Sequence, residues 1–275
     1  SGRRDGQLYH QGVRGWSAMR LASGNPERDK VLELAAKAGG MPVFLDKDFK
    51  PNSADNLPKM RTDYKNVHEA VDKCFYNDFV AQGLAIVISL ATVAEFLKDV
   101  HFGVAGWTPK WNKVQGRPLG DQTTGRTGKD PSSVINSASA KEQSDQHWGN
   151  IHHPTVSMLV LMILAMQRRP GHEGGKDLVV WATDIAAAYP KLSFQSCGVK
   201  YMAMQLFGGL VILFIAGIFG WSGTPAAFAV ITRAVVYELR IRLTGLVEMY
   251  VDDTLGCCPV WDISRNLAIV KIRGL

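Results

Sequence analysis

The sequence predicts an α+β fold, and three observations lead to this class. Helix-like and strand-like segments alternate along the 275 residues without the regular strand–helix–strand units of a doubly wound parallel sheet. Two pairs of short apolar segments are joined by turn residues, Gly208-Gly209 in one and Asp252-Asp253 in the other, which indicates two antiparallel hairpins. The content of 46% hydrophobic and 20% charged residues is typical of a globular protein with one large domain or two smaller ones.

Residues 1–65 contain one predicted helix and a long irregular region. The Asn-Pro-Glu sequence at residues 25–27 is a helix start, with Asn25 as the cap and proline in the first position. Two glycines at residues 39–40 end this helix. Residues 1–65 are assigned to an N-terminal extension of unknown role.

The rest of the chain alternates between helices and strands. Apolar periodicity and turn residues first predict a helix at 66–83, a strand at 84–89, a short helix at 92–100, a basic loop at 113–121 and a polar surface segment at 120–150. The same signals then predict an apolar helix at 154–169, a strand at 178–183 and a hairpin at 201–216. A long helix within 220–243, a hairpin at 246–260 and a helix at 261–275 follow.

Charge and cysteine content narrow the function classes. The net charge of +6 favours an anionic partner such as nucleic acid. Four cysteines without a CxxC pair indicate neither a zinc site nor a disulfide framework. His152-His153 is interpreted as the entry to a helix rather than as a metal site. The polar start of the chain is unlike a signal peptide, so the expected location is intracellular, in the cytoplasm or nucleus.

A membrane span at residues 201–221 is an alternative, because no charged residue occurs between Tyr201 and Thr232. The run is rich in β-branched and aromatic residues, and two glycines interrupt it. We therefore expect two buried strands and no membrane partner.

Asp252 and Asp253 are adjacent carboxylates between apolar residues, and Asp184 ends an apolar strand. A surface turn is one explanation for the Asp-Asp pair, because aspartate is common in turns. The other is a metal site, since close carboxylates repel each other unless a cation neutralises them. Oxygen ligands without cysteine or histidine suit Mg²⁺ or Mn²⁺, and such sites perform two-metal phosphoryl transfer.

Four segments carry a family resemblance. Tyr-Val-Asp-Asp at 250–253 resembles the catalytic hairpin of reverse transcriptases, and residues 183–194 (TDIAAAYPKLSF) resemble the first palm motif of that family. Residues 219–228 (FGWSGTPAAF) resemble its glycine-rich motif, and residues 113–121 (KVQGRPLGD) resemble its fingers hairpin. The order is that of the family, so the chain resembles a retrotransposon-type reverse transcriptase, an RNA-directed DNA polymerase, over about residues 84–260.

The resemblance implies a right-hand polymerase fold with an antiparallel palm sheet. Residues 66–183 are then mainly fingers with the start of the palm, and residues 184–275 are palm, ending before a thumb. It also implies a catalytic and metal-binding set of Asp184, Asp252 and Asp253, to which Ile185 adds a backbone carbonyl. This set is expected to hold two Mg²⁺ ions, with Mn²⁺ as a possible substitute.

The resemblance also implies a nucleotide-binding set. Tyr189 matches the aromatic residue that excludes a ribose 2′-hydroxyl, although an ordinary core aromatic is the alternative. Lys113 and Arg117 match the triphosphate contacts, with solvated loop charges as the alternative. Phe219 stands where many members have glutamine. The remaining positions are expected to let the backbone approach the new base pair, or to form only a helix-entry turn: Gly220, Gly223 and Pro225.

The implied activity is template-directed addition of deoxynucleotides to a primer 3′-hydroxyl. Its partners are an RNA or DNA template with primer and deoxynucleoside triphosphates, while protein partners are not specified. The alternative is a truncated retroelement relic that binds nucleic acid without chemistry.

Overall fold

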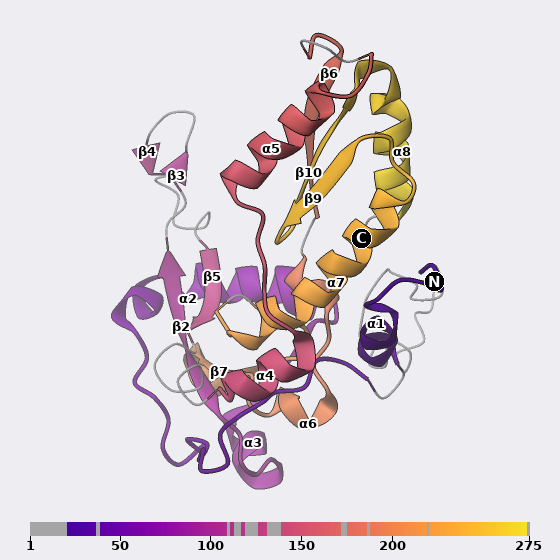
Figure 1. The fold of residues 1–275 in the computed structure, drawn as a ribbon. Coiled ribbons are helices and arrows are strands. Elements are labelled where there is room, and N and C mark those ends of the chain that lie inside the picture. Colours follow the sequence, from indigo (N-terminus) through magenta and orange to yellow (C-terminus); the bar gives the residue numbers. More distant parts are fainter. Residues whose placement is uncertain are drawn as a thin grey trace, which may run out of the picture.

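The computed structural model describes residues 21–36, 39–108, 111–112, 117–118, 126–130, 139–171, 175–185, 188–218 and 220–273. These residues form an α+β fold, as the sequence predicts (Figure 1). The strands are β1 Ala85–Ser89, β2 Phe102–Thr108, β3 Trp111–Asn112, β4 Arg117–Pro118, β5 Arg126–Asp130, β6 Leu178–Asp184, β7 Ala203–Leu206, β8 Leu210–Phe214, β9 Leu246–Tyr250 and β10 Asp253–Pro259. The helices are α1 Arg28–Ala35, α2 Thr62–Phe75, α3 Leu90–Phe96, α4 Lys141–Trp148, α5 Val156–Gln167, α6 Ser196–Val199, α7 Gly223–Arg240 and α8 Ile263–Arg273.

The larger sheet has five strands in the order β1-β8-β7-β2-β5. At its centre lies the β7–β8 hairpin, whose turn residues Gly208 and Gly209 both have a φ of 73°. This left-handed region favours glycine because a side chain would be strained there. β8 pairs antiparallel with β1, and β7 pairs parallel with β2. The predicted hairpin is confirmed.

The same strands rule out the membrane-span alternative for residues 201–221. Residues 203–206 and 210–214 are strands, and Val211, Ile212 and Phe214 are buried in the protein interior. In the part of the chain that the structure describes, no helix combines the length and the apolar composition needed to cross a bilayer.

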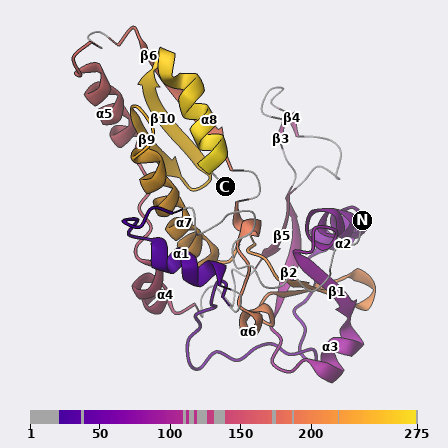
Figure 2. The same cartoon turned by 90° about the vertical axis from the view of Figure 1, so that its right-hand side faces the viewer.

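The smaller sheet has the order β6-β10-β9 and contains the second predicted hairpin. Strand β10 pairs antiparallel with both neighbours. Helices α5 and α8 lie on opposite sides of this sheet (Figure 2). Because β10 is paired along both edges, its ends are held in place by two ladders of backbone hydrogen bonds.

One hydrophobic core joins the two sheets. Its buried side chains include Val31 from α1, Tyr64 from α2, Phe214 from β8, Phe228 from α7 and Val247 from β9. The relative position of the two sheets is therefore set by buried side-chain packing, which tolerates little displacement.

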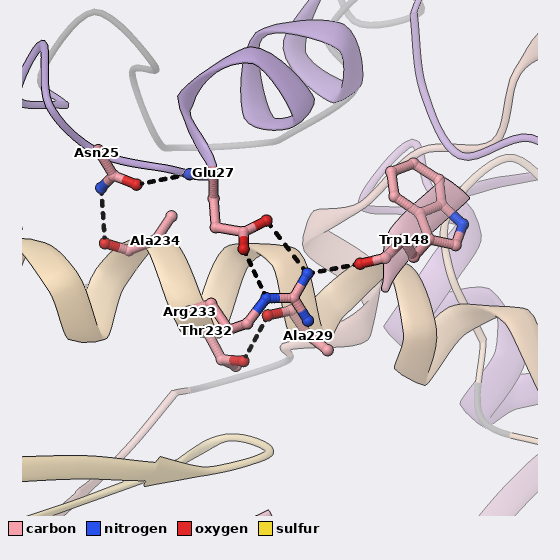
Figure 3. Close-up of polar contacts among 7 residues, drawn as sticks. All are labelled: Asn25, Glu27, Trp148, Ala229, Thr232, Arg233 and Ala234. Carbon is pink, nitrogen blue, oxygen red and sulfur yellow. Dashed lines mark hydrogen bonds and ion pairs between the residues drawn. The ribbon is translucent and has the colours of Figure 1, made fainter. Parts of the chain in front are cut away.

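The N-terminal segment is fastened to α7 by a polar network (Figure 3). The Asn25 amide donates to the Ala234 carbonyl at 3.0 Å, and its oxygen accepts from the Glu27 N–H at 3.0 Å. Arg233 donates to both carboxylate oxygens of Glu27, at 2.8 and 3.1 Å, and to the Trp148 carbonyl at 2.6 Å. The predicted cap differs in detail: α1 begins one residue after Glu27, and Asn25 serves the preceding turn.

Glu238 is a second anchor for the same segment. Its side chain is buried and accepts from the Ala22 N–H at 2.7 Å, from Asn25 at 2.9 Å and from Arg242. Burial alone would raise the pKa of Glu238, but these hydrogen bonds and the charge of Arg242 outweigh it and hold the pKa below its usual value. The ionised form of Glu238 is therefore part of the folded state.

The strands of the two sheets alternate along the sequence, because β7 and β8 of the larger sheet lie between β6 and β9 of the smaller one. The boundary predicted between residues 65 and 66 falls inside α2, which begins at Thr62. The β7–β8 hairpin belongs to the segment 184–275 but completes the five-stranded sheet with β1 and β2. Strand pairing joins residues that are distant in sequence, so local patterns could not show this.

The Glu238→Gln variant tests the buried carboxylate. A charged hydrogen-bond acceptor contributes about 1.5–3 kcal/mol, so the free energy of unfolding near neutral pH is expected to fall by about that amount. Because the folded pKa lies below the ordinary glutamate value of 4.5, this contribution is present above pH 4.5 and lost as the pH falls through the folded pKa. Urea unfolding between pH 3 and pH 7 measures the difference.

The control for this prediction is Glu69→Gln, at an exposed position on α2. It is expected to change the free energy of unfolding by less than about 0.5 kcal/mol. A Glu238→Gln effect that stays constant down to pH 3 contradicts the assignment of an ionised, hydrogen-bonded Glu238.

Candidate active site

The three predicted carboxylates lie at one end of the smaller sheet. β6 ends at Asp184 and β10 begins at Asp253, and these two residues are direct partners in the antiparallel ladder. Asp252 directly precedes Asp253 at the hairpin tip, where its carbonyl accepts the Ile185 N–H at 3.0 Å. Asp184 and Asp253 are exposed and Asp252 is half-buried. Two chain segments about 70 residues apart in sequence thus present their carboxylates side by side, since opposed residues share a face of the sheet.

The turn between β9 and β10 is strained. Val251 has a φ of 57°, a left-handed conformation that is an outlier for a β-branched residue. On either side of it, Tyr250 and Asp253 are partners in the β9–β10 ladder. The ladder therefore holds a conformation that the isolated turn would avoid, as is common at functional sites.

Asp184, Asp252 and Asp253 offer hard carboxylate oxygens, the ligand type that Mg²⁺ and Mn²⁺ prefer. Within the described ranges, however, no three or more His, Cys, Asp and Glu side chains are grouped so that they could hold a metal ion. The chemistry of the donors fits the predicted metals, and the metal site stays a prediction.

Tyr189 lies against the helix that follows the glycine-rich motif. Its ring is buried and meets the Phe228 ring of α7 edge-on, with centroids 5.7 Å apart and an interplanar angle of 75°. Burial raises the pKa of Tyr189, and the negative charge of Asp252 and the neighbouring Tyr250 raise it further. Tyr189 is thus a core aromatic residue that also lies near the carboxylates.

Sequence reasoning missed Gly217, which fixes the turn that carries Tyr189. The Gly217 N–H donates to the Leu192 carbonyl at 2.7 Å. A Cβ atom on Gly217 would lie 2.6 Å from the Tyr189 carbonyl oxygen, closer than any side chain can approach. An isolated glycine within an apolar run was the available signal, because it often marks a close backbone approach.

A small cleft lies beside the β9–β10 hairpin. It brings together two residues of the predicted nucleotide-binding set, Tyr189 and Pro225, with Val251 from the hairpin tip. Residues that were not predicted also line it, among them His153, Phe228 and Arg233. The turn that carries Tyr189, the start of α7 and the β9–β10 hairpin therefore meet at one place.

Gly220 and Gly223 have structural reasons to be glycine. Gly220 has a φ of 98°. A Cβ atom on Gly223, the first residue of α7, would lie 2.3 Å from the Trp221 ring. The helix-entry explanation therefore accounts for both, and contact with a nucleotide stays a prediction.

The remaining predicted residues are at the edge of what the structure describes. Lys113 and Phe219 lie outside the described residues. Arg117 belongs to β4, whose backbone pairs antiparallel with β3 through Asn112 and Arg117. Contact of Arg117 with a triphosphate stays a prediction.

No protein-family model and no curated protein matches the chain. Among solved structures, the chain is similar to the crystal structure of a prototype foamy virus protease-reverse transcriptase, a selenomethionine-labelled CSH mutant. The TM-score is 0.52 with 14% sequence identity, over 94% of this chain and 31% of that chain. The chain thus spans about a third of the length of its structural neighbour. At this identity the likeness shows a shared fold and nothing beyond it.

Gly217→Ala tests the packing that positions Tyr189. The added methyl group is expected to displace the Tyr189 backbone and to lower the free energy of unfolding by about 1–3 kcal/mol. Denaturant unfolding measures it. The control is Gly106→Ala, where a Cβ atom would lie 3.4 Å from the flexible Arg61 side chain. Equal stability of the two variants contradicts a special role for Gly217.

Proposed function

We propose that the chain catalyses template-directed DNA synthesis, adding deoxynucleotides to a primer 3′-hydroxyl with release of pyrophosphate. The observation that carries this proposal is the pairing of Asp184 with Asp253 beside the Asp252–Ile185 backbone hydrogen bond. The proposal is supported by three carboxylates at one end of the smaller sheet, in a chain whose fold is similar to that of a solved protease-reverse transcriptase.

The carboxylates have a defined part in this proposal. Asp184 and Asp252 hold two Mg²⁺ or Mn²⁺ ions, Asp253 supports them, and Ile185 contributes its backbone carbonyl. When bound, such ions activate the attacking hydroxyl and stabilise the leaving pyrophosphate. The chain itself supplies position: the ladder pairs the backbones of Asp184 and Asp253, and the Ile185–Asp252 backbone hydrogen bond joins the hairpin tip to the end of β6 before substrate arrives.

The nucleotide occupies the side of the hairpin where Tyr189 and Pro225 meet. Tyr189 packs beneath the sugar and excludes a 2′-hydroxyl, and Phe228 holds its ring from behind. Gly220 and Gly223 keep the backbone near the new base pair, and Phe219 contacts the nucleotide without a hydrogen bond. Lys113 and Arg117 contact the triphosphate, where an ammonium and a bidentate guanidinium suit phosphate oxygens.

A second candidate is nucleic-acid binding without chemistry. The net charge of +6 favours it, because phosphate contacts supply much of the affinity for nucleic acid. Both candidates require binding of a primer–template duplex. In the first candidate the carboxylates are also needed for incorporation of deoxynucleotides, whereas in the second no reaction follows binding.

Asp252→Asn separates the two candidates. The substitution keeps the shape of the side chain and removes its charge, so incorporation of deoxynucleotides on a primed RNA template is expected to fall by about 100-fold or more. Extension of a labelled primer in the presence of Mg²⁺ measures the rate, and duplex binding is measured in parallel.

The matched control is Asp177→Asn, an exposed aspartate next to the opposite end of β6. It is expected to extend primers at the wild-type rate. Extension that persists in Asp252→Asn removes the assignment of the hairpin as the catalytic centre. Duplex binding with no extension by the wild-type protein supports the second candidate instead.

Tyr189→Ala tests sugar selection. Without the ring, ribonucleotides are expected to be incorporated far better, by a change in discrimination of about 1–3 kcal/mol. Tyr189→Phe is expected to keep the wild-type discrimination, because the ring and not the hydroxyl blocks the 2′-position. Single-nucleotide incorporation with deoxy- and ribonucleotides measures the ratio. An unchanged ratio in Tyr189→Ala contradicts the role of Tyr189.

A further inference from the structure

An aromatic contact links the catalytic hairpin to the segment before α5. The rings of His153 and Tyr250 have centroids 4.8 Å apart and are tilted by 48°. Tyr250 is the last residue of β9 and is 47% exposed. His153 is exposed as well. The contact therefore lies on the surface, outside the hydrophobic core.

Tyr250 is joined to the hairpin tip through the backbone. It is the ladder partner of Asp253, which is in turn the partner of Asp184. It also directly precedes Val251, whose left-handed backbone is strained. A displacement of Tyr250 therefore moves the strained turn and Asp253 with it.

His153 lies in a segment that is held at both ends. Upstream, the Trp148 ring is buried, and the Trp148 carbonyl accepts from Arg233 at 2.6 Å. Downstream, the Thr155 hydroxyl accepts the Met158 N–H at 3.2 Å and so caps α5. Pro154 between them restricts the backbone. His153 thus offers its ring from a segment that has anchors of its own, at the Trp148 carbonyl and at the start of α5.

The His153–Tyr250 contact lies next to the candidate site. His153 lines the cleft beneath the hairpin together with Tyr189, Pro225 and Val251. The side chain that meets Tyr250 therefore comes from the wall of the candidate site.

We infer that His153 is a positioning residue, whose ring holds Tyr250 and thereby the carboxylates of the hairpin. It acts through packing: the exposed Tyr250 ring has a preferred partner, so the hairpin tip samples fewer conformations. Its consequence for catalysis rests on the proposed function. If the carboxylates are less often in place, kcat falls, while KM for the deoxynucleotide stays nearly constant because Tyr189 and Pro225, the proposed nucleotide contacts in this cleft, are unchanged.

Hydrogen exchange on the protein alone tests the structural part. In His153→Ala, the backbone amides of residues 249–254 are expected to exchange about three-fold to ten-fold faster, as the loss of one aromatic pair implies. The amides of α7 serve as an internal reference for global stability. His153→Phe keeps a ring without the imidazole nitrogens, and it is expected to restore the wild-type exchange.

The matched control is His68→Ala, which removes a second His–aromatic pair. His68 stacks on Phe207 with centroids 3.9 Å apart, at the tip of the β7–β8 hairpin. It is expected to leave the exchange of residues 249–254 unchanged. Wild-type exchange in His153→Ala overturns the inference, and so does exchange in His153→Phe that is as fast as in His153→Ala.

Steady-state primer extension then tests the catalytic part. A lower kcat at constant KM in His153→Ala, restored in His153→Phe, supports positioning, whereas wild-type kcat in a variant with faster exchange overturns it. Because exchange needs no substrate, the two hypotheses can fail separately. Faster exchange in a protein that incorporates no nucleotide supports the contact and contradicts the proposed function.

Discussion

The pairing of β10 between β6 and β9 is the constraint on which the candidate site depends. It opposes Asp253 to Asp184 on one side and to Tyr250 on the other. A slip of one residue would turn the carboxylate of β10 to the other face, because side chains alternate along a strand. Gly256 opposes such a slip: a Cβ atom there would lie 2.1 Å from the Trp181 ring, so the indole fits only over this position.

Helix α7 connects the site to the rest of the molecule. Near its start, Pro225 and Phe228 lie beside Tyr189, and further along it Arg233 and Glu238 bind the N-terminal segment. The N-terminal segment, for which the sequence suggested no role, is thus fastened to the helix that supports the site. We regard residues 22–27 as part of the scaffold, because the Asn25 side chain is buried and the Ala22 N–H, Asn25 and Glu27 all form hydrogen bonds with α7.

Local signals in the sequence predicted the elements that carry the site. Both hairpins, the long helix and the end of β6 at Asp184 follow from apolar patterning and turn residues. Non-local contacts account for what was missed. The polar segment 120–150 contains β5 and α4, and α4 is anchored by the buried ring of Trp148. Local patterns did not single out Gly217 and His153, because their contacts are with Tyr189 and Tyr250, which are distant in sequence and are brought close by the fold.

The central claim is that the three carboxylates form a divalent cation site next to a nucleotide site. It is tested most directly by anomalous X-ray diffraction from crystals of the protein with Mn²⁺, primer–template and a non-hydrolysable deoxynucleoside triphosphate. The account predicts Mn²⁺ between the carboxylates of Asp184 and Asp252, with the nucleotide sugar against Tyr189. A nucleotide bound elsewhere, with no Mn²⁺ at these carboxylates, would contradict it.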